Sequence, residues 1–180
     1  MKKIFLIAGH QSNTGANGLL KEGEETIRLR NLIHKYLRRK NIEPIVDDDC
    51  MVLPQVVKWL RKKVAREDIC IDIHFNCSSN ADAHGTEVFI PDQYTADEKQ
   101  LADRLLATIT QTLGTRNRGV KKESETNAGR IAMLSSFDCC NLLIEVCFIS
   151  NQSDVEKYKA RRNILAEAIA EVIAKALSHE

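Results

Sequence analysis

The chain alternates between short apolar runs and longer segments in which apolar residues recur every three or four positions. The short runs predict β-strands over residues 4–8, 42–46, 69–76, 85–91 and 141–150. The helical spacing predicts helices over residues 22–40, 54–67, 95–113 and 161–177, with a further short helix near Asp154. Strands interleaved with helices predict a single-domain α/β fold, in which a mostly parallel, twisted sheet carries helices on both faces.

The segment 69–76, ICIDIHFN, alternates strictly between the two faces of one predicted strand. Its three isoleucines and Phe75 point to one side. Cys70, Asp72, His74 and Asn76 point to the other side. This strand therefore presents a histidine and an aspartate on the same face.

Composition restricts the classes of function. The 180 residues include only three prolines and 43% hydrophobic residues, which is the size and core content of one domain. A formal net charge of +1 and an aromatic content of 5% give no support for a nucleic-acid partner. No run approaches the roughly 20 apolar residues of a membrane span, so we expect no membrane insertion.

The cysteines and the N-terminus indicate the compartment in which the chain is made. The six cysteines include no CxxC pair, and Cys139 and Cys140 are adjacent, which favours reduced core thiols over disulfides or a cysteine-bound zinc. The apolar run after the N-terminal lysines is shorter than the roughly 7–15 residues of a signal-peptide core. We therefore expect synthesis in the cytoplasm without a signal peptide.

Three predicted strands carry a metal-capable group at or near their carboxyl ends, where open α/β sheets bind ligands. His10 follows the first strand, His74 lies in the third, and Glu145 lies in the last. Each has a plainer alternative: His10 could be a turn residue, His74 could face solvent, and Glu145 could form a core salt bridge. Glu145 is the hardest to dismiss, because an unpaired carboxylate in an apolar strand costs several kcal/mol or takes up a proton.

A fourth group could come from the start of the first predicted helix, in the sequence GLLKEGEET. Glu22, Glu24 and Glu25 all suit a helix N-terminus on electrostatic grounds alone. Counting back four and seven positions from the inward-facing Leu29 gives Glu25 and Glu22, whereas Glu24 points away. Two imidazoles and one carboxylate form the ligand set of a catalytic zinc, and a further carboxylate could act as general base. The combination indicates a zinc hydrolase with Zn²⁺ as its cofactor.

Six short motifs follow one another along the chain: FLIAGHQSNTGA, GLLKEG, ICIDIHFN, HGTEVFI, NRGVK and LLIEVCFISN. In order and spacing, from Lys3 to about Leu177, they resemble the zinc-dependent N-acetylmuramoyl-L-alanine amidases, the family often called amidase type 3. The resemblance implies that residues 1–180 form a single catalytic amidase domain, without a separate cell-wall-binding domain. It also implies peptidoglycan as the partner, and hydrolysis of the amide between the lactyl group of N-acetylmuramic acid and L-alanine of the stem peptide.

The resemblance also implies a role for each candidate residue. His10 and His74 would bind zinc, and Glu145 would take a proton from the attacking water and pass it to the leaving amine. The third ligand in the family is the glutamate that opens the helix, with apolar residues five, seven, eleven and fifteen positions later. Counting from Glu22 meets this pattern, whereas counting from Glu24 does not. Glu22 is therefore the expected third ligand, and Glu25 is the alternative.

The sequence departs from the family pattern at several positions near these residues. An aspartate commonly stands two residues before the glycine of the GH pair, where this chain has Ile7. A small hydroxyl residue is common two positions before the second histidine. This chain has Asp72 there, which could orient a ligand or lie at a solvated strand end. Gln11 and Ser12 replace the usual glycines, and we expect substrate preference to depend on the loop that they form with Asn13.

The remaining histidines lie outside this expected site. We expect His34 and His179 at the surface, and His84 in a loop from which it could line the cleft.

Two alternatives to an active amidase stay open. A catalytically inactive peptidoglycan-binding module with the amidase fold would not require a buried general base such as Glu145. A nucleotide-binding α/β protein is disfavoured, because GHQSNTG has neither G-x-G-x-x-G nor Walker spacing. An amidase made without a signal peptide would act on the cell wall after release, as a phage or prophage lysin freed by a holin, or after dedicated export. The sequence leaves the oligomeric state open.

Overall fold

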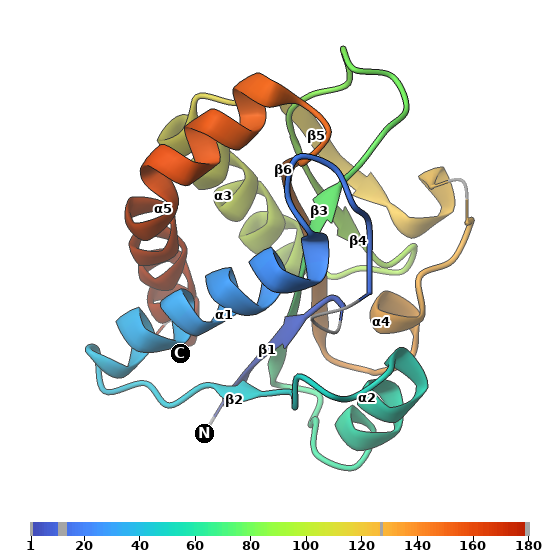
Figure 1. Cartoon of the computed structure of the whole chain (residues 1–180). Helices are drawn as coiled ribbons and strands as arrows, with labels where there is room; N and C mark the ends of the chain where they lie inside the picture. The colour runs from blue at the N-terminus through green and yellow to red at the C-terminus, as the bar shows by residue number, and fades with distance from the viewer. Residues whose placement is uncertain (1, 11–13, 127, 179–180) are drawn as a thin grey trace.

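A computed structural model of the chain describes residues 2–10, 14–126 and 128–178. Its sheet contains the strands β1 (Ile4–Ala8), β2 (Ile45–Val46), β3 (Ile69–Asn76), β4 (Thr86–Ile90), β5 (Asn117–Lys122) and β6 (Cys140–Phe148). The α-helices are α1 (Glu22–Arg38), α2 (Leu53–Leu60), α3 (Ala96–Leu113), α4 (Ala132–Ser135) and α5 (Gln152–Ser178), and a 3₁₀ turn, η1, spans Glu123–Glu125. Figure 1 shows these elements packed as one α/β unit.

The six-stranded sheet has the order β2-β1-β3-β6-β4-β5. β1 is parallel to both β2 and β3, and β3 is parallel to β6. β4 is antiparallel to β6, and β5 runs parallel to β4. The predicted mostly parallel sheet is confirmed, and the carboxyl ends of β1, β3 and β6 meet at one edge.

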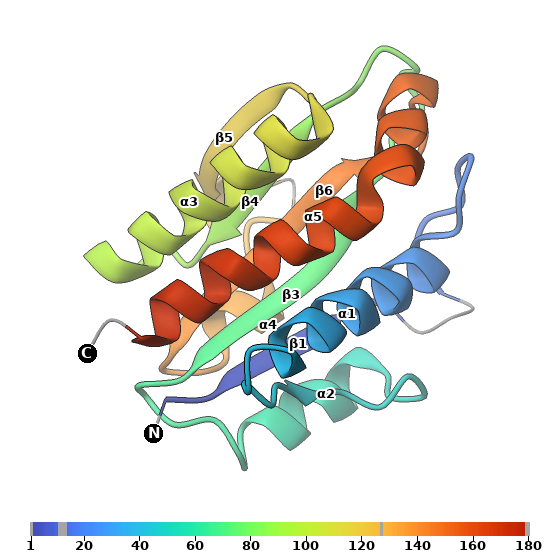
Figure 2. The same ribbon diagram turned by 90° about the vertical axis from the view of Figure 1, so that its left-hand side faces the viewer.

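Helices cover both faces of the sheet, as the sequence predicts (Figures 1 and 2). α1, α5 and α3 lie side by side on one face, where Leu29, Leu105 and Ile169 are buried in the larger hydrophobic core. α2 and α4 lie on the other face, where Val56 and Met133 are buried in a smaller cluster with residues of β1. This layering removes the apolar side chains of the central strands from water on both sides.

The alternation predicted for segment 69–76 is confirmed in β3. Ile71 and Phe75 are buried in the larger core, whereas Cys70 belongs to the smaller cluster on the opposite face. Because side chains alternate along a strand, Asp72 and His74 share the face of Cys70.

Several predicted element boundaries are wrong. The helix predicted over 54–67 ends at Leu60, because the exposed residues 61–63 are all basic and offer no apolar contact. The short helix near Asp154 and the helix over 161–177 form one helix, α5, since no glycine or proline interrupts it and buried Val155 and Tyr158 continue its inner face. The strand predicted over 42–46 is reduced to β2.

Three elements were not predicted at all, and they have weak hydrophobic patterns. The edge strand β5, NRGVKK, is polar and only partly buried, and it pairs on one side alone. η1 and α4 are each no longer than four residues, which is too short for helical periodicity to be visible.

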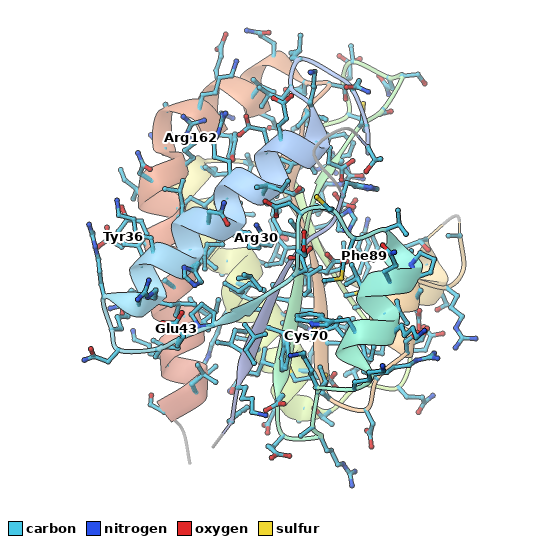
Figure 3. All side chains as sticks on the ribbon, turned by 60° about the horizontal axis from the view of Figure 1, so that its bottom comes forward. Arg30, Tyr36, Glu43, Cys70, Phe89 and Arg162 are labelled. Atoms are coloured by element: carbon cyan, nitrogen blue, oxygen red, sulfur yellow. The ribbon has the colours of Figure 1, made fainter. Side chains whose placement is uncertain are left out.

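A buried ion pair ties α1 to the sheet beneath the end of β1. Arg30 of α1, labelled in Figure 3, contacts the buried Asp47 at 2.7 Å and the more exposed Asp49 at 2.5 Å. Asp47 Oδ1 also accepts a hydrogen bond from the Ala8 backbone N–H at 3.1 Å. The last residue of β1, and hence the turn that follows it, is thereby held against α1.

Within the described part of the chain, no helix is both long and apolar enough to cross a membrane.

Truncation of Leu29 to alanine should lower the free energy of unfolding by about 2–5 kcal/mol, because Leu29 is fully buried where α1 packs on the sheet. Ile164→Ala on α5 is the matched control, since Ile164 is 62% exposed and should change stability by less than about 0.5 kcal/mol. Guanidinium unfolding of both variants measures the difference. Equal losses would contradict the packing described here.

Candidate metal centre

Three of the residues expected to bind a metal converge at the carboxyl ends of β1 and β3. One ligand atom from each of His10, Glu22 and His74 lies within 4.8 Å of the other two. His10 Nε2 is 3.5 Å from Glu22 Oε2, and His74 Nδ1 is 3.1 Å from Glu22 Oε1. His10 comes from the turn after β1, His74 from β3 and Glu22 from the first position of α1. Elements distant in sequence therefore assemble one site.

The Glu22 carboxylate is the most strongly held member of this cluster. Its Oε2 accepts a hydrogen bond from the Ala16 backbone N–H at 2.8 Å, and its Oε1 accepts one from the Phe75 N–H at 3.2 Å. Burial acts to raise the pKa of Glu22, but the hydrogen bond and charge of His74 and the Ala16 N–H outweigh it and lower the pKa. Glu22 is thus an ionised carboxylate in a buried position, as a cation ligand must be.

Two glycines allow the loop between β1 and α1 to pass this close to the cluster. A Cβ on Gly9 would lie 2.3 Å from His74 Nε2, so any side chain at this position would force the imidazole of His74 to move. Gly15 has φ of +87°, and a Cβ there would lie 2.9 Å from both Glu22 Oε2 and the His10 ring. The loop can approach the cluster this closely because both positions lack a side chain.

The two imidazoles have opposite pKa shifts. Burial lowers the pKa of His10, which keeps this ring neutral and able to donate an electron pair. Burial also acts to lower the pKa of His74, but the charge of Asp72 and the hydrogen bonds to Asp72 and Glu22 outweigh it and raise the pKa well above its usual value. A cation at Nδ1 would have to displace a proton from His74.

Glu145 faces the cluster from the neighbouring strand. It is the register partner of His74 across the β3–β6 pair. Its Oε2 is buried and has no hydrogen-bond partner among the described residues, so the predicted alternative of a core salt bridge has no cation at this oxygen. Burial raises the pKa of Glu145 to about 8, against the opposing charge of His74. Glu145 as a residue is half-buried, and the structure leaves its buried Oε2 without a hydrogen-bond partner among the described residues.

This donor set fits a zinc ion. Two imidazole nitrogens and one carboxylate oxygen are the protein ligands of several catalytic zinc sites, which keep a position open for water or substrate. The unpartnered Oε2 of Glu145 beside them is the kind of buried polar atom that a bound water or substrate would satisfy.

The other two glutamates at the start of α1 point elsewhere. Glu24 is exposed and pairs with Lys21 at 3.0 Å, as expected for a residue that points away. Glu25, the alternative third ligand, is buried but accepts hydrogen bonds from Arg28 at 2.7 Å and from the Tyr158 hydroxyl of α5 at 3.1 Å. Glu25 therefore joins α1 to α5 and is not part of the cluster.

Of the remaining residues considered in the sequence, only Asp72 contacts a member of the cluster in the described structure. Asp72 is only 3% exposed, so the alternative of a solvated strand end is wrong; its Oδ2 lies 3.1 Å from His74 Nε2. His84 lies in the β3–β4 loop and contacts the Asp82 carbonyl, and half-buried His34 lies 3.4 Å from Glu43. The expectations for Gln11, Ser12, Asn13 and His179 fall outside the described residues.

One further carboxylate near the site, Glu87, was not predicted from the sequence. Glu87 of β4 is the register partner of Glu145 and accepts hydrogen bonds from Asn76 at 2.7 Å, Arg118 at 3.0 Å and Lys121. Burial opposes ionisation, but these donors outweigh it and lower the pKa of Glu87. The sequence did show Asn76 on the same face of β3 as His74, which indicates a further polar partner nearby. It could not show that this partner is Glu87, because the contact depends on the antiparallel pairing of β4 with β6.

A cavity of about 210 Å³ opens beside the cluster. Its lining includes His10, Asp72 and His74 together with apolar side chains of β1, α2, α4 and β6. A larger cavity of about 880 Å³ lies between α3 and the N-terminal ends of β3 and β6, and none of the cluster residues lines it. The smaller cavity therefore borders two of the three candidate metal ligands, His10 and His74.

Comparison with known proteins agrees with the motifs and the fold. The profile of the family described as "N-acetylmuramoyl-L-alanine amidase" matches residues 4–177. N-acetylmuramoyl-L-alanine amidase LytC of Bacillus subtilis (strain 168) is 29% identical over 161 residues, which cover 87% of this chain and 31% of LytC. The chain thus spans about a third of the length of this relative.

Solved structures show the same fold. The catalytic domain of CwlV, an N-acetylmuramoyl-L-alanine amidase from Bacillus (Paenibacillus) polymyxa var. colistinus, superposes with a TM-score of 0.82 at 22% identity, covering 100% of both chains. Cwp6 from Clostridium difficile superposes with a TM-score of 0.84 at 24% identity, covering 98% of this chain and 29% of Cwp6. Because the family profile matches nearly the whole sequence, the resemblance seen in the motifs is confirmed, and the chain belongs to the N-acetylmuramoyl-L-alanine amidase family.

Proposed function

We propose that the protein is a zinc-dependent N-acetylmuramoyl-L-alanine amidase. It hydrolyses the amide between the lactyl group of N-acetylmuramic acid and L-alanine of the peptidoglycan stem peptide. The observation that carries this proposal is the convergence of His10, Glu22 and His74 beside the free, buried oxygen of Glu145. Membership of the family supplies the substrate class.

In this proposal His10, Glu22 and His74 hold the zinc ion. When bound, zinc supplies Lewis acidity, which polarises an amide carbonyl and makes a nearby water a stronger acid. The buried carboxylate of Glu22 contributes a fixed negative charge, and its two backbone hydrogen bonds keep it in place.

Glu145 moves the proton. Its free Oε2 accepts a proton from the water as that water attacks the amide carbonyl, and the protonated carboxyl then donates this proton to the departing L-alanine nitrogen. Burial raises the pKa of Glu145, which makes its carboxylate a stronger base in the first step and lets the carboxyl hold the proton until the second. Glu87 stays ionised through its three donors and takes no part in this transfer.

The alternative of an inactive peptidoglycan-binding module is less well supported. Binding alone has no use for a buried carboxyl without a partner, because such a group costs free energy in the folded state. The Oε2 atom of Glu145 is a buried carboxyl oxygen that has no partner among the described residues.

We further propose that the chain forms a single catalytic domain and that this domain acts on the cell wall, outside the cytoplasm. The routes inferred from the sequence, release as a phage or prophage lysin or dedicated export, stay predictions.

Substitution of Glu145 by glutamine should lower the rate of wall hydrolysis by about 10²–10⁴-fold, because the amide cannot accept the proton. Purified sacculi digested by the native protein should gain L-alanine N-termini without new reducing ends. Zinc content should be equal in the native protein and Glu145→Gln, since Glu145 is proposed as a base and not a ligand. New reducing ends would indicate a glycosidase and would contradict the proposed bond.

Substitution of Glu22 by glutamine should remove most bound zinc, because the third ligand loses its charge. Glu24→Gln is the matched control: it removes the same charge two residues away, in the same first turn of α1, but on the exposed side. Zinc measured by elemental analysis after gel filtration distinguishes the two. Retention of zinc in Glu22→Gln together with its loss in Glu24→Gln would reverse the ligand assignment.

A further inference from the structure

Asp72 is a buried aspartate whose contacts are unusually few. Its Oδ2 lies 3.1 Å from His74 Nε2, and its Oδ1 is buried without a hydrogen-bond partner among the described residues. Asp68, just before the same strand, is equally buried but accepts hydrogen bonds from the backbone N–H groups of Lys3 and Ala65. Asp68 therefore stabilises the backbone, whereas the contact seen for Asp72 is with the imidazole of His74.

This contact decides which nitrogen of His74 can bind a metal. Nδ1 faces the cluster, 3.1 Å from Glu22 Oε1, and Nε2 faces Asp72 on the other side of the ring. A ring nitrogen binds a metal only when it carries no proton, so metal at Nδ1 requires the remaining proton on Nε2. Asp72 Oδ2 is in position to accept that N–H, which fixes both the tautomer and the orientation of the ring.

The register of the sheet links Asp72 to a second unusual position. Ile7 on β1 and Asp72 on β3 are register partners in adjacent parallel strands, and both line the cavity beside the cluster. At both of these positions the sequence departs from the family pattern, which commonly has an aspartate at position 7 and a small hydroxyl residue at position 72. This chain thus has an apolar side chain on β1 and a carboxylate opposite it on β3, and both line the same cavity.

We propose that Asp72 is a positioning residue of the metal centre. It accepts the Nε2–H of His74, holds Nδ1 towards the metal, and supplies from β3 the carboxylate that the family commonly places at position 7 of β1. This inference rests on the proposed zinc site, and its test separates the failure of one from the failure of the other.

The test measures Zn²⁺ affinity by competition with a chromophoric chelator. Asp72→Ser should weaken zinc binding by about 10–100-fold, because the ring loses its charged acceptor. Asp72→Asn should lose less, since an amide oxygen can still accept the Nε2–H. Asp68→Asn is the matched control: it should lower the melting temperature but leave zinc affinity within about twofold, because Asp68 contacts backbone at the opposite end of β3.

A second experiment tests whether a carboxylate at position 7 can replace the one at position 72. Ile7→Asp added to Asp72→Ser should recover part of the lost zinc affinity, because a carboxylate returns to the neighbouring position on the same face. If the double variant binds zinc no better than Asp72→Ser, position 7 does not substitute for position 72, and that part of the proposal is overturned.

A measurement on the native protein requires no variant to fold. Nitrogen-15 spectra of the zinc-loaded protein should show His74 protonated at Nε2, and a proton at Nδ1 instead would overturn the proposal. Unchanged zinc affinity in Asp72→Ser would also overturn it while leaving the zinc site intact. Failure of the native protein to bind zinc would overturn both proposals.

Discussion

The buried carboxylate of Glu22 is the constraint on which the candidate site depends. It receives two backbone N–H groups and contacts two imidazoles, and these four groups belong to the β1–α1 loop and to β3. An ionised carboxylate in such a position would cost several kcal/mol without these partners. The loop that contains Gly9 and Gly15 must pass close to the cluster, because the Ala16 N–H donates a hydrogen bond to Glu22 and the His10 ring contacts it.

The mixed sheet places two carboxyls, those of Glu87 and Glu145, opposite each other in environments that shift their pKa values in opposite directions. β4 runs antiparallel to β6, which sets Glu87 opposite Glu145. Glu87 is saturated by Asn76, Arg118 and Lys121 and its pKa is lowered, whereas Glu145 has a free oxygen and its pKa is raised to about 8. Carboxyls whose environments move their pKa values apart are typical of sites where one holds charge and the other carries a proton.

The sequence predicted those parts of the fold and site that depend on local periodicity. The bounds of β3 and the two faces of its side chains were found correctly, and helical counting from Leu29 separated Glu22 from Glu24. β5 was missed because an edge strand that pairs on one side has little hydrophobic pattern to detect. The pairings of Glu87 with Glu145 and of Ile7 with Asp72 depend on strand order and register, which are set by packing across the whole sheet.

The most direct measurement is X-ray diffraction from zinc-loaded crystals, with anomalous data collected on either side of the zinc absorption edge. We expect one strong anomalous peak, at about 2.0–2.2 Å from a nitrogen of His10, from Nδ1 of His74 and from a carboxylate oxygen of Glu22. A zinc peak held by other residues, or bonded to His74 through Nε2, would contradict this expectation.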